Sequence, residues 1–137
     1  MITFFDSNVL VYLFDDSHPT SQSKALARLA HAMKHERVVV STQVLHEFVN
    51  VVTRKLKPGL TMDEARDRVA QFCQFDVVGS NSVSVQAAMT LVQQHKISWW
   101  DALILEAALR SDADVLVSED GQHGRRFGKL VVENPFL

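Results

Sequence analysis

The chain has 137 residues, of which 47% are hydrophobic and 22% charged, and its formal net charge is −2 at pH 7. These values predict one globular domain over residues 1–137 with a sizeable core, and they exclude a disordered chain and nucleic-acid binding by overall positive charge. A single cysteine, a start (MITFFDSN) without a basic leader and the lack of a long apolar run predict a cytoplasmic protein with no disulfide and no membrane span.

Short apolar runs alternate with longer amphipathic segments along the chain. The first half predicts strands at 2–5 and 37–41 and helices at 8–14 (capped by Ser7), 21–36 and 43–55 (capped by Thr42). The second half predicts helices at 62–74 (opened by a Thr61–Glu64 capping box), at 82–95 and after Ser98, with strands at 75–78, 114–118 and 129–134. This alternation is typical of a mainly parallel sheet covered by helices on both faces, so we predict an α/β sandwich of four to five strands.

Four carboxylates fall at the edge of this predicted core. Asp6 directly follows the first strand, and Asp120 lies two residues after the strand that ends in VLVS. In an open parallel sheet, ligands bind beyond the carboxyl ends of the strands. Glu47 and Asp101 lie on helices, three or four residues from apolar side chains, and therefore share a helix face with them. We expect the four acids to converge on one pocket.

A group of buried acids is costly, because desolvation and mutual repulsion disfavour the charged form of each carboxylate. A divalent cation removes this conflict, and Mg²⁺ and Mn²⁺ are hard ions that take oxygen ligands. Carboxylates that leave open coordination positions are typical of metal-assisted phosphodiester hydrolysis. The spacing of Asp6, Glu47, Asp101 and Asp120 therefore predicts a Mg²⁺ or Mn²⁺ site.

Each acid also has an ordinary structural explanation. Asp6 could cap the helix that follows it, and Asp101 could close a capping box with Ser98. Glu47 could pair with the basic residues at the end of its own helix, and Asp120 in SEDG resembles a turn residue. The joint placement of two acids at strand ends and two on apolar helix faces favours the metal site.

The motifs around these acids resemble those of a PIN domain, specifically a VapC-type toxin ribonuclease, over essentially the whole chain. FFDSNVLVY resembles the opening strand with its first acid, STQVLHEFVNVVTRK the segment with the glutamate, and SWWDALILEAA the motif with the third acid. ADVLVSEDGQHG is similar to the last motif, with Ser118 and Asp120 at its Ser/Thr-x-Asp positions. Asn8 also fits the opening motif.

The resemblance implies a PIN-like three-layer α/β/α sandwich and a magnesium- or manganese-dependent endoribonuclease that hydrolyses single-stranded or looped RNA. It implies that the four acids hold one or two ions. It also implies that Ser118 and Asn8 hydrogen-bond to a carboxylate or a metal-bound water and so orient it. It also implies a small antitoxin protein as partner and a homodimer.

A basic cluster formed by Arg125, Arg126 and Lys129 follows the last acid. Arg125 and Arg126 could contact RNA phosphates, and a solvated run of charge is the ordinary alternative. His123 in the same loop could contact the substrate, and an ordinary loop position is the alternative, since the six histidines show no zinc-ligand spacing. Trp99 and Trp100 could stack on bases or pack in the core.

Two other classes of function stay open at the level of sequence. Receiver-like phosphoacceptor domains resemble one another in having an acidic pair after the first strand and a lysine after a late strand. In this chain Asp6 alone follows the first strand, and the acids of LVSED stand where the lysine would be expected. A catalytically silent PIN-like module would bind RNA or a protein without cutting. The presence of all four acids argues against a silent module, and an assay for metal-dependent cleavage separates the two.

Overall fold

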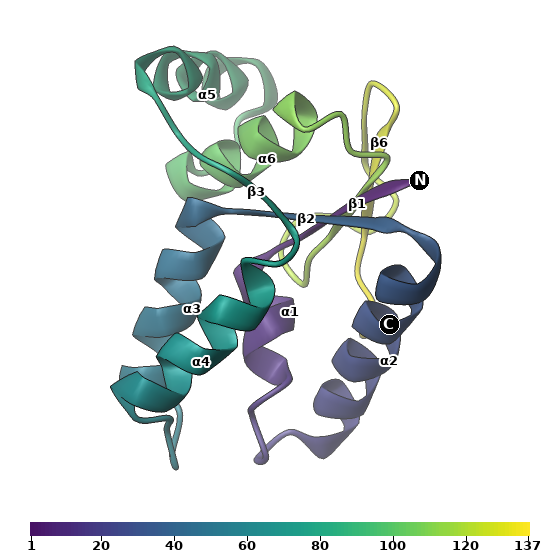
Figure 1. Ribbon diagram of the computed structural model, residues 1–137. Coiled ribbons are helices and arrows are strands. Elements are labelled where there is room, and N and C mark those ends of the chain that lie inside the picture. The colour runs from purple at the N-terminus through teal and green to yellow at the C-terminus, as the bar shows by residue number, and fades with distance from the viewer.

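A mainly parallel sheet forms the centre of the computed structural model, which describes residues 1–137 (Figure 1). Its strands are β1 (Ile2–Phe5), β2 (Arg37–Ser41), β3 (Asp76–Val78), β4 (Val115–Val117), β5 (Arg126–Phe127) and β6 (Leu130–Glu133). They are arranged in the order β3-β2-β1-β4-β6-β5, and only the β5–β6 pair is antiparallel. The predicted parallel sheet is confirmed, with six strands where four to five were predicted.

Helices cover both faces of this sheet. They are α1 (Ser7–Tyr12), α2 (Pro19–His35), α3 (Thr42–Arg54), α4 (Met62–Phe72), α5 (Ser82–His95) and α6 (Trp99–Arg110). In Figure 1, α5 and α6 lie above the sheet and the first four helices lie below it. The predicted three-layer sandwich is therefore confirmed. None of the helices combines the length and the apolar character needed to cross a lipid bilayer.

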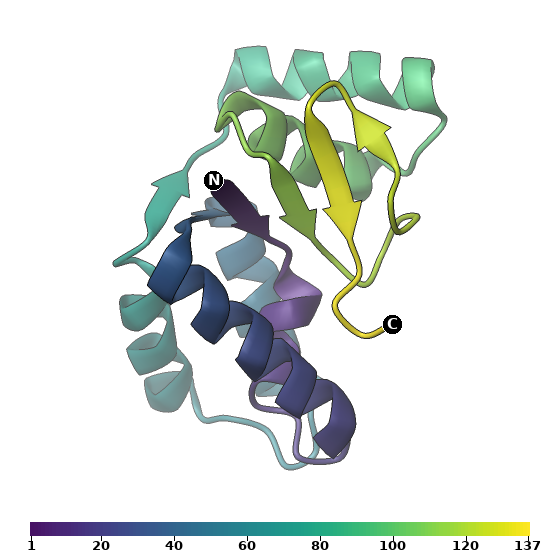
Figure 2. The same cartoon turned by 90° about the vertical axis from the view of Figure 1, so that its right-hand side faces the viewer.

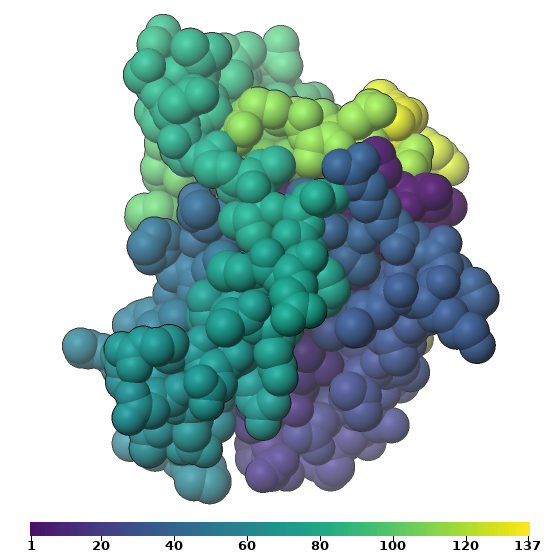
Figure 3. Space-filling view, viewed as in Figure 1, coloured from purple at the N-terminus to yellow at the C-terminus, as the bar shows by residue number.

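The termini of the chain lie on the same side of the molecule (Figure 2). In the space-filling view, the segment of α4 and β3 lies across the front of the molecule, between α3 and the start of β2 (Figure 3). The main core lies beneath it and contains the fully buried Phe4, Phe5 and Phe48. The rings of Phe48 and Phe72 meet edge to face with their centroids 5.1 Å apart, which joins α3 to α4.

Two helix caps differ by one residue from the prediction. Asp6, and not Ser7, caps α1, because its carboxylate accepts a hydrogen bond from the Ser7 N–H. Ser41, and not Thr42, caps α3, because its hydroxyl accepts the Val44 N–H at 3.2 Å. In both places the strand passes into the helix without a loop, so the residue at the strand end also serves as the cap.

The other helix starts agree more closely with the sequence pattern. The Thr61–Glu64 capping box is present at α4, and the Ser98 hydroxyl caps α6. The helix predicted to begin at residue 21 begins at Pro19, a residue suited to the first turn of a helix. The extra strand, β5, is only two residues long, too short to show an alternating pattern.

A charged cluster is buried between α2 and the sheet. The guanidinium of Arg28, which is 14% exposed, pairs with Glu36 at 3.1 Å and with Glu133 at 2.5 Å. Arg28 donates two hydrogen bonds to Glu36, and the Thr3 hydroxyl donates a third at 2.6 Å. Burial opposes the charged form of Glu36, but the hydrogen bonds from Arg28 and Thr3 outweigh it and hold the pKa of Glu36 below its usual value.

Candidate active site

The ends of β1 and β4 place the first acid beside the last motif. The two strands are parallel neighbours with Phe5 opposite Val117, so Asp6 and Ser118 leave the sheet side by side. The Asp6 N–H donates to the Val117 carbonyl at 3.0 Å, and the Ser118 hydroxyl donates to Asp6 Oδ2 at 2.7 Å. Asp6 and Ser118 are 112 positions apart in the sequence, and they meet because β1 and β4 are neighbours in the sheet.

Asp6 is the buried acid of the site, since only 6% of the residue is exposed. Burial raises the pKa of Asp6 to about 6, although hydrogen bonds from Ser118 and from the Ser7 N–H lower it, and the neighbouring Glu47 and Asp120 raise it further. The protein thus holds a carboxylate in surroundings that disfavour its charge. A cation bound at its oxygens would reverse that balance.

Glu47 reaches Asp6 through a serine. The Ser7 hydroxyl donates to Glu47 Oε2 at 2.8 Å, and its oxygen lies 3.4 Å from Asp6 Oδ1. The Gln43 amide donates to the other Glu47 oxygen at 2.8 Å. Glu47 makes no ion pair with the basic residues at the end of α3, so the structure does not contain the alternative pairing considered from the sequence. Ser7, proposed from sequence only as a cap, connects two of the acids.

Asn8 fixes the loop that follows β4. Its amide nitrogen donates to Asp120 Oδ2 at 3.2 Å, and its oxygen accepts the Glu119 N–H at 3.2 Å. The Asp120 N–H donates in turn to the Ser118 hydroxyl oxygen at 3.0 Å. Ser118 therefore hydrogen-bonds to Asp6, whereas Asn8 hydrogen-bonds to Asp120 and not to the first carboxylate.

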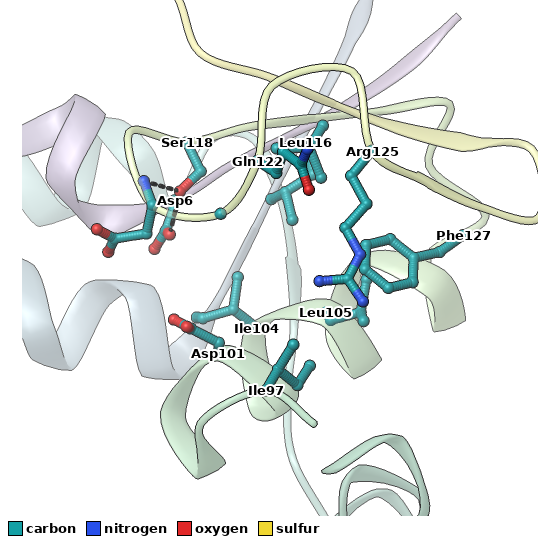
Figure 4. Close-up of a pocket in the computed structure, with 13 residues that line it drawn as sticks. Asp6, Ile97, Asp101, Ile104, Leu105, Leu116, Ser118, Gln122, Arg125 and Phe127 are labelled. Atoms are coloured by element: carbon teal, nitrogen blue, oxygen red, sulfur yellow. Dashed lines mark hydrogen bonds between the residues drawn. The ribbon is translucent and has the colours of Figure 1, made fainter. Parts of the chain in front are cut away.

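Asp101 approaches from the opposite side, at the start of α6. The Ser98 hydroxyl accepts the Asp101 N–H at 3.1 Å, but the Asp101 carboxylate returns no hydrogen bond to the Ser98 backbone, so the capping box is only half formed. The carboxylate instead lines a hollow shared with Asp6, Ser118 and Asp120 (Figure 4). The hollow is open to solvent.

The acids differ in burial more than the sequence predicts. Asp6 is buried and Glu47 half-buried, whereas Asp101 and Asp120 lie on the exposed rim. Glu47 does not line the hollow and faces a neighbouring groove bordered by Trp99 and Trp100, of which Trp100 is 66% exposed. Convergence on one pocket is therefore seen for three of the acids, and Glu47 is linked to them through Ser7.

The basic residues separate into different roles. Arg125 lines the hollow, whereas Arg126 lies exposed on β5 and is not part of the lining. Lys129 pairs with Asp112 and Asp114. His123 accepts the Asn134 N–H at 3.0 Å and so holds its own loop.

The acids around the hollow meet part of what a metal ion requires of its ligands. No three His, Cys, Asp or Glu side chains are arranged to enclose one. The donors available are all carboxylate oxygens, which suit Mg²⁺ or Mn²⁺, and Asp6 is a buried acid without a cationic partner. The Asp101 carboxylate is also free of hydrogen bonds from the protein. The chemistry of these residues fits a hard dication, with the acids on two sides of an open hollow.

The fold and the carboxylate hollow define an α/β domain with a group of acids at the carboxyl ends of β1 and β4. A family model described as the PIN domain matches residues 3–128. The chain therefore belongs to the PIN domain family. This membership removes the receiver-like alternative. No curated protein matches the chain.

Solved structures with a similar fold include two toxin–antitoxin complexes and one toxin. The chain is similar to a toxin–antitoxin complex from Klebsiella pneumoniae (TM-score 0.72, 16% identity, 97% of each chain). It is also similar to VapBC2 from Rickettsia felis bound to a promoter DNA fragment (TM-score 0.67, 21% identity, 98% of each chain). A third similar structure is VapC20 of Mycobacterium tuberculosis, a toxin that cleaves the sarcin–ricin loop (TM-score 0.63, 16% identity, 83% of this chain and 86% of that one).

Proposed function

We propose that this protein is a metal-dependent endoribonuclease, the VapC-type toxin of a toxin–antitoxin pair, and that it hydrolyses phosphodiester bonds in RNA. The observation that carries the proposal is the buried Asp6 at the ends of β1 and β4, hydrogen-bonded by Ser118 and facing a hollow with two further acids. Membership in the PIN domain family and the toxins among the structural neighbours support it.

The proposed ligands of Mg²⁺ or Mn²⁺ are Asp6, Glu47, Asp101 and Asp120. A dication held there supplies charge stabilisation at the scissile phosphate and lowers the pKa of a bound water. The chain's own task is to hold the ligand oxygens in place. Ser118 and Ser7 do so for Asp6 and Glu47, and Asn8 does so for Asp120.

The first test is cleavage of an unstructured RNA by the purified protein, with Mg²⁺ or Mn²⁺ and with EDTA. We expect cleavage only with metal. We expect Asp101→Asn to lower the cleavage rate by more than about 100-fold. Substitution of residues that only hydrogen-bond to metal ligands already lowers metal affinity or activity roughly 10- to 100-fold. Asp63→Asn is the matched control, since Asp63 is an exposed acid at the start of α4 and is 91% exposed.

Cleavage by Asp101→Asn at the parental rate, still sensitive to EDTA, would contradict the site. The lack of a closed three-ligand cluster favours one other candidate, a silent PIN-like module that binds RNA or a protein without cutting. RNA binding without cleavage under every metal condition would establish that alternative.

We also propose a small antitoxin as partner, supported by the toxin–antitoxin complexes among the structural neighbours. A homodimer is the proposed state in solution, and it stays a prediction from the sequence resemblance. Co-expression of this chain with the short protein encoded beside it should yield a stable complex in which RNA cleavage is suppressed. Size-exclusion chromatography and the cleavage assay measure both properties. Recovery of the chain alone, with its activity unaffected by the neighbouring gene product, would refute the partner.

A further inference from the structure

The hollow beside the acids continues into a slot with apolar walls. Asp6 and Asp101 stand at one end, and Arg125 and Phe127 at the other (Figure 4). Ile97, Ile104 and Leu105 lie on one side of it and Leu116 on the other, and Val132 also lines it. A metal ion and a phosphate need only the acidic end, so the apolar end is available to another part of a bound molecule.

Arg125 lies at the far end of the slot and makes two contacts with the protein there. Its guanidinium lies over the Phe127 ring, 4.8 Å from the centroid, and donates to the His95 carbonyl at 3.4 Å. It makes no ion pair, whereas the more exposed Arg37 is paired with Asp76. A half-buried arginine with spare donors in a slot suits a planar polar ligand with hydrogen-bond acceptors.

Gln122 adds a second polar group above the slot. It lies in the loop after β4, between Gly121 and Gly124, both of which have a φ of +83°, a conformation that favours glycine. Its side-chain amide has no hydrogen-bond partner in the protein, so its donor and its acceptor are both available. In Figure 4 it lies between Ser118 and Arg125.

We propose that this slot binds the base of one unpaired nucleotide next to the scissile phosphate, and that the base is preferentially guanine. The inference rests on the proposed ribonuclease function and names the nucleotide that the site would select. Apolar walls suit the faces of a base, and an unpaired base is free to enter. Arginine offers donors only, and guanine presents two acceptors, O6 and N7, on one edge.

The experiment compares hexanucleotide RNAs that carry a single guanine, or another base in its place, as substrates of the parent and of Arg125→Ala. We expect the parent to cut next to guanine, with a kcat/KM about 10-fold or more above that for other bases. Arg125→Ala should lose this preference and leave the slower substrates within about 3-fold of their parental rates, by the same reasoning. Arg66→Ala is the matched control, since the Arg66 side chain lies on α4, is 69% exposed and does not line the slot.

Ile97→Trp is a second variant that fills the slot without altering a charge. It should abolish the guanine preference as Arg125→Ala does, and thermal melts of all variants confirm folding. Uniform loss for every base in Arg125→Ala would show a phosphate contact and overturn the proposal, as would a parent without base preference.

Measurements of RNA binding in EDTA distinguish failure of the proposed ribonuclease function from failure of the proposed base-binding slot. If no RNA is cut, we measure the affinity of the parent for the guanine hexanucleotide and for its abasic counterpart at that position. About 10-fold weaker binding of the abasic RNA by the parent, but not by Arg125→Ala, supports the slot even without cleavage. Equal affinities would overturn it.

Discussion

Asp6→Asn is expected to abolish RNA cleavage and, in metal-free buffer near neutral pH, to raise the free energy of unfolding. The substitution removes one ligand oxygen and the negative charge. Asparagine keeps the geometry, because its oxygen can accept the Ser7 N–H and its amide can donate to the Ser118 hydroxyl oxygen. Cleavage should fall by more than about 100-fold, for the reason given for Asp101→Asn.

The gain in stability follows from the pKa of Asp6, which burial raises to about 6 from a reference value of 3.8. The folded state therefore binds the proton more tightly than the unfolded state, and the free energy of unfolding of the parent decreases as pH rises through this window. The full difference is on the order of 3 kcal/mol, so Asp6→Asn should gain about 1 to 3 kcal/mol at neutral pH.

Urea unfolding in EDTA at several values between about pH 4 and pH 7 measures this effect, and the advantage of Asp6→Asn should grow with pH. Addition of Mn²⁺ should stabilise the parent and leave Asp6→Asn nearly unchanged, since only a ligand that binds the folded state raises its stability. A variant less stable than the parent in EDTA at neutral pH would show that the charge of Asp6 is already compensated within the protein.

Arg28→Met should lower the free energy of unfolding by about 3 to 5 kcal/mol, because it leaves the charge of Glu36 buried without its partner. The Glu36 side chain is only 6% exposed. The arginine holds the pKa of Glu36 below its usual value, so the pair stabilises the parent above that value and this contribution is lost on acidification. The difference between parent and variant in urea unfolding should accordingly shrink as pH falls below the usual glutamate range.

Arg37→Met provides the control for this cluster. The side chains of Arg37 and Asp76 are 66% and 47% exposed, and solvent screening leaves such a pair little effect on stability. Adding Glu36→Gln to Arg28→Met should recover part of the lost stability, because the amide can still accept the Thr3 hydroxyl without a charge. Equal losses of unfolding free energy from Arg28→Met and Arg37→Met would show that burial of the cluster does not affect stability.

Much of the fold could be predicted because each strand is a short β-branched or aromatic run bounded by polar residues. The position of Asp6 at a strand end follows from that pattern, and so does its place at the edge of the sheet. The two misplaced caps lie where a strand passes directly into a helix, so that local spacing does not distinguish Asp6 from Ser7 or Ser41 from Thr42. The short β5 is defined by its pairing with β6, which is a tertiary contact.

The candidate site was predicted less completely, because helical periodicity gives the face of a residue and not its depth. Asp101 shares a face with Ile104 and Leu105 and still lies exposed on the rim, in the first turn of α6. The link from Ser7 to Glu47 depends on the packing of α1 against α3. A hydroxyl directly after the first acid and a glutamine between two glycines were the only sequence features that marked Ser7 and Gln122.

The adjacency of β1 and β4 has a consequence during protein synthesis. Asp6 emerges from the ribosome early, but its hydrogen-bond partner Ser118 is added 112 residues later. Closing so long a loop delays formation of the central strand pair until most of the chain is available. A growing polypeptide therefore has no assembled carboxylate hollow, and a chain with the proposed activity would spare the ribosome and message that are producing it until β4 has been made.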